Sequence, residues 1–376
     1  MTGIAVLGST GSIGRQTLEV IAGLGPDYRV LALAAGRDSE AFSVQLAAHP
    51  HARAWCAAGR SDLTAGRWAD GGLEELATLE GVELVVIATT GMAALPAVLA
   101  ALRAGRHVAL ANKETLVTGG HLVAGLLDDL GGDSLERLRP IDSEHSAIWQ
   151  CLVGERLAEI ERLVLTASGG PFRGRSPETL AGVTAEEALA HPTWRMGPKI
   201  TIDSATLVNK AFEVIEAKWL YRLPYSKIEA VIHPQSVVHS LVEFVDGSYK
   251  AQLGLPDMRL PIQYALTYPA RLPSPARRSS PDAWAPLSFA PLPAGAFPAY
   301  DVVRSAADAG GNRGTILNAA DEVAVAGFLE GRIGFPMIAD TIASAVDRWG
   351  DDHEPEIEEI VALDADVRAT LSEAIG

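Results

Sequence analysis

Cysteine, positive charge and long hydrophobic runs are scarce in this chain of 376 residues. The two cysteines, Cys56 and Cys151, supply neither a disulfide framework nor a zinc-binding pattern, which is typical of a reducing compartment. The formal net charge of −16 argues against a general binder of nucleic acid or of anionic membranes, because a phosphate backbone would be repelled. A phosphorylated small molecule is compatible with this charge, since a few local cations are enough to bind one.

Only one hydrophobic run, LVVIATTGMAALPAVLAAL at residues 84–102, is long enough to raise the question of a membrane span. Thr89, Thr90 and Gly91 interrupt it, so the run predicts a buried parallel strand, a turn and a packed helix instead. The N-terminus lacks a basic start followed by an apolar run, which predicts no signal peptide. We therefore expect a cytoplasmic protein with no membrane and no nucleic-acid partner.

The chain is too long for one compact core, so several domains are expected. Residues 1–132 alternate short apolar runs with helix-length segments, which predicts βαβ units and a parallel sheet. The predicted strands cover residues 4–7, 30–35, 84–88 and 107–111. This first segment, residues 1–132, is predicted to be a Rossmann-like domain.

The remaining residues fall into three further segments. Residues 133–267 mix helical and strand patterns, including a hairpin through Asp246-Gly247, and are predicted to form an α+β catalytic domain. Residues 268–293 are rich in proline, which favours a stiff linker. Residues 294–376 have helical periodicity and are predicted to form a C-terminal helical domain. The predicted fold class is α/β.

A glycine-rich turn is predicted in VLGSTGSIGRQTL, residues 6–18, where Gly8, Gly11 and Gly14 lie between a strand and a helix. Such a turn holds a dinucleotide pyrophosphate in Rossmann domains, although the first gap here is three residues instead of two. After the second predicted strand, Arg37 is suited to the 2′-phosphate of NADP, which favours NADPH. The alternative is that Arg37 is solvated and Asp38 caps the next helix.

Two polar segments carry candidate substrate and metal groups. In LANKETLV, Lys113 is placed to reach a substrate, and Asn112 and Glu114 to reach the cofactor, because ligands of open α/β sheets lie at the carboxyl ends of strands. In PIDSEHSAIW, Asp142 and Glu144 supply the paired carboxylates that bind hard cations such as Mg²⁺. Ordinary helix capping is the alternative for both segments.

The segment GPKITIDSATLVNKAFEVIEAKWL predicts a helix that begins near Ser204. Its expected core face comprises Leu207, Val208, Phe212, Ile215 and Trp219. Asn209 and Glu213 then lie four residues apart on one polar face, with Lys210 beside them.

These polar residues suggest two sites. Glu213 facing Asp142 and Glu144 would complete a three-carboxylate metal site. The second site is a phosphate pocket, for which hydrogen-bond donors and a cation are needed. Its candidate residues are Lys210, Asn209, Ser204 and Ser168, the last from the segment TASGGPFR.

The segment HPTWRMG, residues 191–197, is a predicted loop, and its Trp194 and Met196 suit a lid over an active site. The alternative is a loop anchored in the core. His145 could have a catalytic role, but a lone histidine is more often structural. Structural roles are also expected for His233 and His239, because they lie in a strand context without nearby acids.

Seven ordered motifs together closely resemble the 1-deoxy-D-xylulose-5-phosphate reductoisomerase family. They are GSTGSIG, LANKE, IDSEHSAI, TASGGPFR, HPTWRMGPKITIDSATLVNKAFEVIEA, HPQSVVHS and LPDMRLP, and they run from residue 3 to about residue 330. The resemblance implies a cytoplasmic homodimer that acts in non-mevalonate isoprenoid biosynthesis. It would use NADPH and Mg²⁺ or Mn²⁺, with Co²⁺ as a further candidate.

Matching the family motifs to this sequence implies a set of site residues. The implied cofactor contacts are Thr10, Gly11, Ser12, Ile13, Gly36, Arg37, Asn112, Glu114 and Gly197. The implied metal ligands are Asp142, Glu144 and Glu213. The implied substrate contacts are Lys113, Ser143, Glu144, Ser168, His191, Ser204, Asn209, Lys210 and Glu213, among which Lys113, Glu144 and His191 would be catalytic.

Two positions depart from the family pattern. Arg37-Asp38 stands where the family commonly has Lys-Asn, and Arg195 stands where a serine is usual. The implied reaction is a metal-assisted rearrangement of 1-deoxy-D-xylulose 5-phosphate, by retro-aldol cleavage and recombination, to an aldehyde. Reduction by NADPH would then give 2-C-methyl-D-erythritol 4-phosphate.

Two other interpretations differ in the chemistry that they need. A semialdehyde dehydrogenase requires an activated cysteine beside a histidine, and neither Cys56 nor Cys151 has that context. A non-catalytic NADPH sensor would have no use for three metal-suited carboxylates and a cation-lined pocket. Loss of NADPH oxidation on adding a chelator would separate the reductoisomerase from both.

Overall fold

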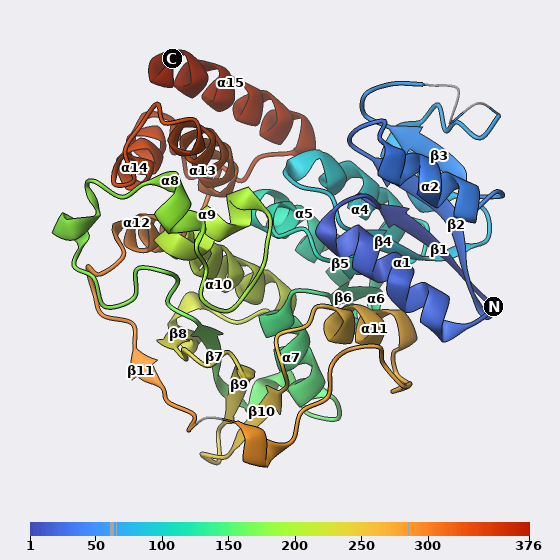
Figure 1. The fold of residues 1–376 in the computed structure, drawn as a ribbon, viewed down its shortest axis with the longest axis horizontal. Coiled ribbons are helices and arrows are strands. Elements are labelled where there is room, and N and C mark those ends of the chain that lie inside the picture. Colours follow the sequence, from blue (N-terminus) through green and yellow to red (C-terminus); the bar gives the residue numbers. More distant parts are fainter. Residues whose placement is uncertain (61–63, 65, 285) are drawn as a thin grey trace. The chain divides into compact units, whose positions relative to one another are not determined.

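Six parallel strands form one sheet of the computed structural model, which describes residues 1–60, 64, 66–284 and 286–376 (Figure 1). The spatial order β3-β2-β1-β4-β5-β6 is that of the Rossmann fold. The strands are β1 Thr2–Leu7, β2 Tyr28–Ala35, β3 Arg53–Cys56, β4 Val82–Ile87, β5 His107–Leu110 and β6 Leu138–Pro140. The parallel sheet and its four predicted strands are confirmed, and β1 beside β4 marks the point where the strand order reverses.

The chain divides into two compact units. The first comprises residues 1–115, 123–149 and 257–278, and the second comprises residues 116–122, 150–256 and 279–376. Within the described residues, the helices that lie wholly or mostly in the first unit are α1 Ser12–Leu24, α2 Glu40–Ala48, α3 Gly72–Thr78, α4 Leu95–Arg103, α5 Glu114–Leu130, α6 Ser134–Arg137, α7 Ser143–Leu152 and α11 Arg259–Thr267. The division into four sequence segments stays a prediction.

The hydrophobic run at residues 84–102 folds as predicted, into the end of β4, a turn and α4. Val85, Val86 and Ile87 are fully buried between β1 and β5, which explains their continuous hydrophobicity. A 3₁₀ turn at Met92–Ala94 leads into α4. None of the helices within the described residues is long and apolar enough to cross a membrane.

Helix α11 returns to the first unit although more than a hundred residues separate it from β6. It packs on α1, where the Arg259 guanidinium lies 2.8 Å from the Glu19 carboxylate. Arg139 of β6 donates to the backbone carbonyl of Ala265 at 2.9 Å. The motif LPDMRLP therefore contributes to the Rossmann-like unit.

A mixed five-stranded sheet of order β10-β9-β7-β8-β11 belongs to the second unit. Its strands are β7 Ile160–Ala167, β8 Ile228–Ile232, β9 Val238–Phe244, β10 Tyr249–Leu253 and β11 Ala290–Pro291. Strands β9 and β10 pair antiparallel on either side of Asp246-Gly247, so the predicted hairpin is confirmed. The proline-rich residues contribute β11, which pairs with β8.

Helices α9 Pro198–Thr206 and α10 Val208–Tyr221 of the second unit carry candidate site residues. The same unit holds α8 Ala185–Leu189, α12 Pro298–Ala309, α13 Arg313–Leu329, α14 Met337–Trp349 and α15 Ile357–Ile375. The predicted helical character of the C-terminal residues is thus confirmed. Short 3₁₀ turns lie at Leu157–Glu159, Pro177–Leu180, Tyr225–Lys227 and Pro281–Ala283.

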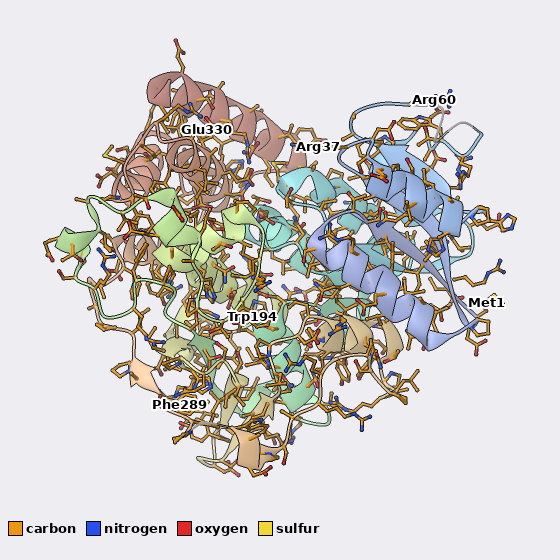
Figure 2. The ribbon with its side chains drawn as sticks, viewed as in Figure 1. Met1, Arg37, Arg60, Trp194, Phe289 and Glu330 are labelled. Atoms are coloured by element: carbon orange, nitrogen blue, oxygen red, sulfur yellow. The ribbon has the colours of Figure 1, made fainter. Side chains whose placement is uncertain are left out.

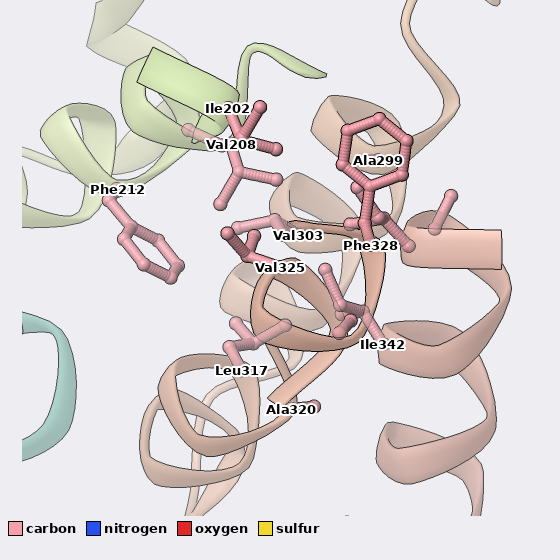
Figure 3. Close-up of a cluster of buried hydrophobic side chains, with 14 of the residues drawn as sticks. Ile202, Val208, Phe212, Ala299, Val303, Leu317, Ala320, Val325, Phe328 and Ile342 are labelled. Atoms are coloured by element: carbon pink, nitrogen blue, oxygen red, sulfur yellow. The ribbon is translucent and has the colours of Figure 1, made fainter. Parts of the chain in front are cut away.

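One hydrophobic core joins α9 and α10 to the C-terminal helices (Figure 3). Ile202 of α9 and Phe212 of α10 are buried in the same cluster as Val303 of α12, Leu317 of α13 and Ile342 of α14. The C-terminal helices therefore support the two helices on which the predicted phosphate pocket lies.

The predicted helix beginning near Ser204 is wrong in its boundary. Helix α9 ends at Thr206, Leu207 adopts a left-handed conformation with φ of 59°, and α10 begins at Val208. Leu207 is buried in a separate cluster with Ala167, and Trp219 is only half-buried. No glycine or proline lies at this break, and the helical periodicity continues across it. The sequence therefore contained no signal for the end of one helix and the start of the next.

Candidate active site

The glycine turn follows β1 and leads into α1 at the point where the strand order reverses. Gly8 has φ of +92°, and a Cβ there would lie 2.3 Å from the carbonyl oxygen of Ala88. A Cβ on Gly14 would lie 2.3 Å from the carbonyl oxygen of Gly8. Glycine is therefore required at both positions, and it lets the exposed N-terminus of α1 stand close to the turn. This close approach fits a bound pyrophosphate.

Arg37 lies just beyond the end of β2 and is exposed, as are its neighbours Gly36 and Asp38 (Figure 2). The alternative that Asp38 caps the next helix is wrong. Ser39 is the N-cap of α2, and its hydroxyl accepts the backbone N–H of Phe42 at 3.3 Å. Serine is as good a cap as aspartate, so the sequence could not decide between these neighbours.

The Asn112 side chain connects the segments that follow β4 and β5 through hydrogen bonds. Its side-chain nitrogen donates to the carbonyls of Thr89 and Gly91 at 3.1 and 2.9 Å, and also to the Glu114 carboxylate at 2.9 Å. Its side-chain oxygen accepts the backbone N–H of Thr115 at 2.8 Å. The Asn112 amide therefore fixes the turn after β4 and the start of α5, both at the ligand-binding edge of the sheet.

A cation and two carboxylates gather where β5 and β6 end. Lys113 follows β5, is only 8% exposed, and forms an ion pair with Asp142, which follows β6. The Ser143 hydroxyl donates to the Glu144 carboxylate at 2.6 Å at the start of α7. Because β5 and β6 are adjacent and parallel, these groups come from neighbouring strand ends of the first unit.

In the second unit, helix α10 is mostly buried, yet it carries several polar side chains that contact one another. Asn209 donates to the Glu213 carboxylate at 2.6 Å, and Lys210 forms an ion pair with the same carboxylate. Lys210 and Glu213 are 3% and 1% exposed, so the predicted polar face is confirmed but is nearly removed from solvent. Buried charges are costly, which argues that this group is kept for binding or catalysis.

The loop after β7 brings Ser168 to helix α9. Gly170 has φ of +65°, and a Cβ there would lie 2.6 Å from the carbonyl oxygen of Ser204. The two serines predicted for the phosphate pocket therefore belong to backbone segments in direct contact. The double glycine of TASGG was the local signal for this close approach.

His191 begins the predicted loop between α8 and α9, and one ring nitrogen, Nε2, lies 3.1 Å from the Ser168 hydroxyl. Burial lowers its pKa below the ordinary histidine value. Trp194, labelled in Figure 2, is half-buried, with its ring centroid 6.4 Å from that of His239, whereas Arg195 is exposed. Gly197 is the exposed N-cap of α9, directly before Pro198. The loop is thus held at its first residue.

His233 has the structural role that its sequence context predicted. Its Nε2 accepts backbone N–H groups of Val237 and Val238 at 3.2 and 3.1 Å, and its ring stacks on Phe289 with centroids 4.6 Å apart. His145 is fully buried.

Models of one family match three stretches of the chain. The 1-deoxy-D-xylulose 5-phosphate reductoisomerase model matches residues 4–120, and two C-terminal domain models of this enzyme match residues 138–221 and 253–370. The 1-deoxy-D-xylulose 5-phosphate reductoisomerase of Pelotomaculum thermopropionicum is 48% identical over 375 residues, covering 97% of this chain and 96% of the relative. That of Thermomicrobium roseum is 47% identical over 383 residues, covering 100% and 98%.

The chain belongs to the 1-deoxy-D-xylulose 5-phosphate reductoisomerase family.

Solved members of the family have the same fold. A DOX-P reductoisomerase in complex with NADPH, fosmidomycin and magnesium superposes with a TM-score of 0.92 at 36% identity, covering 100% of this chain and 98% of that one. The Zymomonas mobilis enzyme in complex with NADPH gives 0.90 at 38% identity, covering 100% and 99%. As a member of the reductoisomerase family, the chain is an enzyme.

The cysteines do not suit the alternative dehydrogenase chemistry. Both are buried, and burial raises the pKa of the Cys151 thiol to about 11. Thioester chemistry needs a thiolate, so Cys151 is not poised as a nucleophile.

Some residues that shape the site were not predicted from the sequence. They are the backbone carbonyls of Thr89 and Gly91, the backbone N–H groups of Thr193 and Trp194, and an ion pair in which the Lys199 ammonium lies 2.8 Å from the Asp321 carboxylate. The Thr-Thr-Gly turn after a strand was a usable signal for the first group. The others depend on contacts that no local pattern encodes.

Proposed function

We propose that this chain converts 1-deoxy-D-xylulose 5-phosphate to 2-C-methyl-D-erythritol 4-phosphate, using NADPH and a divalent metal ion. The assignment follows from family membership over essentially the whole chain. The observation that carries it in the structure is the group of Lys113, Asp142 and Glu144, which lies at the carboxyl ends of β5 and β6 in a sheet whose β1 ends in a dinucleotide turn.

NADPH would lie across the glycine turn. The N-terminus of α1 offers unpaired backbone N–H groups and a partial positive charge to the pyrophosphate. Arg37 is placed to pair with the 2′-phosphate, which NADH lacks. The remaining proposed contacts are Thr10, Gly11, Ser12, Ile13, Gly36, Asn112, Glu114 and Gly197.

Asp142, Glu144 and Glu213 are the proposed ligands of the metal ion. Three carboxylates are a hard oxygen donor set, which fits Mg²⁺ or Mn²⁺. A solved member of the family at 36% identity is a complex with magnesium. When bound, the ion supplies Lewis-acid polarisation of substrate oxygens, and NADPH supplies the hydride.

The substrate phosphate is proposed to bind among Ser168, Ser204, Asn209 and Lys210. The hydroxyls and the amide supply donors, and the buried Lys210 supplies a positive charge whose attraction is little screened by water. Ser143 and His191 complete the proposed substrate contacts. Holding the phosphate away from the reacting carbons orients the rest of the molecule.

Lys113 and Glu144 are the proposed catalytic residues at the reacting end. The Lys113 ammonium stabilises negative charge on a substrate oxygen, and its near-complete burial strengthens this effect. His191 is proposed to lie beside the substrate, which its contact with the proposed phosphate ligand Ser168 supports. A homodimer in the cytoplasm, with Mn²⁺ as an alternative ion, completes the proposal.

The test is NADPH absorbance in the presence of 1-deoxy-D-xylulose 5-phosphate, with Mg²⁺, with Mn²⁺, or with a chelator. We expect oxidation only when substrate and metal are both present, and fosmidomycin should inhibit it. A chain that binds NADPH but never oxidises it would support the sensor interpretation. Oxidation that persists with excess chelator would reject the proposed metal chemistry.

A further inference from the structure

Both ring nitrogens of His191 are engaged within the second unit. Its Nδ1 lies 3.1 Å from the backbone nitrogen of Thr193 and 2.9 Å from that of Trp194. Its Nε2 lies 3.1 Å from the Ser168 hydroxyl. The imidazole therefore connects the beginning of the loop at residues 191–197 to the loop after β7.

These contacts determine where the imidazole carries its proton. A backbone N–H can only donate, so Nδ1 must accept from Thr193 and Trp194 and cannot carry a proton. A neutral imidazole has one proton, which then lies on Nε2 and is donated to the Ser168 hydroxyl oxygen. Burial lowers the pKa of His191, which supports the neutral state.

The same geometry determines the direction of the Ser168 hydrogen bonds. The Ser168 hydroxyl oxygen accepts from Nε2 of His191 and from the backbone N–H of Gly170 at 3.2 Å. A serine hydroxyl has two lone pairs and one proton, so both lone pairs are used. Its proton is left to donate to a third group, and an anionic oxygen is the acceptor that benefits most.

We propose that His191 is a positioning residue, held as the neutral Nε2–H tautomer, which anchors the loop through Nδ1 and directs the Ser168 hydroxyl proton toward a substrate phosphate oxygen. It exchanges no proton with the substrate. The part that concerns Ser168 rests on the proposed function, whereas the tautomer and the loop anchor rest on contacts within this chain alone.

The tautomer is tested by ¹⁵N NMR of histidine-labelled protein at mildly alkaline pH, with the His191 signals assigned by their loss in His191→Asn. We expect one nitrogen with the shift of an unprotonated acceptor at Nδ1 and one with the shift of an N–H at Nε2. A proton on Nδ1, or an imidazolium, would overturn the proposal.

Two substitutions of His191 test the contacts of its two ring nitrogens independently. In His191→Asn, the side-chain oxygen can replace Nδ1 and accept the N–H groups of residues 193 and 194, as in an Asx turn, but the contact with Ser168 is lost. In His191→Gln, a side-chain N–H can reach toward Ser168 but the loop anchor is lost. The control is His353→Asn, because His353 lies in the exposed segment between α14 and α15.

Hydrogen exchange of residues 191–197 measures the anchor without substrate. We expect protection like that of the native chain in His191→Asn and in the control, but reduced protection in His191→Gln. Equal protection in all of them would show that the ring does not anchor the loop. This readout holds even for a chain that never turns over, so it can fail independently of the proposed function.

Steady-state kinetics measure the other role. Loss of one net hydrogen bond corresponds to roughly 5-fold, so we expect KM for the phosphorylated substrate to rise by about that factor in His191→Asn, with kcat nearly unchanged. A positioned acid or base contributes about 10²–10⁴-fold to the chemical step. A kcat loss of that size in both variants, at unchanged KM, would show proton transfer and overturn the proposal.

Discussion

At the scale of the residue, Arg37 tests which dinucleotide the chain binds. Arg37→Ala should weaken NADPH binding far more than NADH binding, because only NADPH has the 2′-phosphate. Loss of one charge-assisted contact suggests about 10-fold or more. Fluorescence titration of both cofactors measures this, and Arg29→Ala at the opposite end of β2 is the control. Equal weakening of both cofactors would show that Arg37 does not contact that phosphate.

The stability of the loop at residues 191–197 should depend on pH through His191, in a direction that follows from the lowered pKa of this histidine. Because burial lowers the pKa in the folded state, the unfolded loop binds more protons at acidic pH, and stability of the loop rises with pH. The contribution is complete above the unfolded histidine pKa of about 6.5 and is lost as pH falls through it toward the folded value. Protonation of Nδ1 also removes the acceptor for Thr193 and Trp194.

We therefore expect exchange of residues 191–197 to accelerate as pH is lowered below about 6.5, after correction for intrinsic rates. His191→Asn should show no such step, because an amide does not titrate. A step that survives in His191→Asn would assign the titration to another group.

At the scale of the element, Lys199 contacts residues of three helices, α9, α10 and α13, two of which carry the proposed phosphate-binding residues. The Lys199 ammonium of α9 lies 2.7 Å from the Asp203 carboxylate and 2.8 Å from the Asp321 carboxylate of α13. It also lies 5.4 Å from the ring centroid of Phe212 on α10. Ser204 lies on α9 and Lys210 on α10, so the contacts of Lys199 help to place both residues.

Lys199→Met should destabilise this arrangement, because it removes the ammonium that Asp203 and Asp321 share. Breaking a buried pair costs about 3–5 kcal/mol, and the lower end is expected because the Lys199 side chain is 30% exposed. Urea unfolding measures the loss. The matched control Lys227→Met removes a more exposed lysine and should change stability much less. Equal losses of unfolding free energy in the two variants would show that the ion pairs of Lys199 do not stabilise the fold.

The ionisation of Asp321 should make stability depend on pH in the direction opposite to that expected for His191. Burial raises its pKa, with Lys199 opposing that shift, so the folded chain favours the protonated acid. Stability from this group is therefore highest at acidic pH and falls as pH rises from the unfolded toward the folded pKa. Asp321→Asn should remove that fall while leaving the helices in place. An unchanged pH profile of urea unfolding would contradict this account of the cluster.

At the scale of the whole molecule, the sequence predicted the features that local patterns encode. Gly8 and Gly14 marked the dinucleotide turn because nothing larger fits there, and the turn at Asp246-Gly247 located the hairpin of β9 and β10. Lys113 and Glu213 were candidates both from their local patterns and from the family resemblance, although their burial was not foreseen.

Long-range contacts account for what the sequence did not predict. Lys199 and Asp321 are far apart in the chain, and neither lies in a recognisable pattern with the other. The return of α11 to the first unit likewise depends on Arg259 meeting Glu19. The break at Leu207 is held by burial in the tertiary structure, which overrides the helical preference of the residues around it.

The central proposal is that Asp142, Glu144 and Glu213 bind one divalent ion. Electron paramagnetic resonance of Mn²⁺ binding tests it directly in the native chain, Asp142→Asn, Glu144→Gln and Glu213→Gln, with Glu186→Gln on the exposed face of α8 as control. We predict one ion per native chain, native affinity in the control, and affinity reduced by at least about 10-fold in each of the three variants. Native Mn²⁺ affinity in Glu213→Gln, with loss only in the other two, would contradict a site that includes the Glu213 carboxylate.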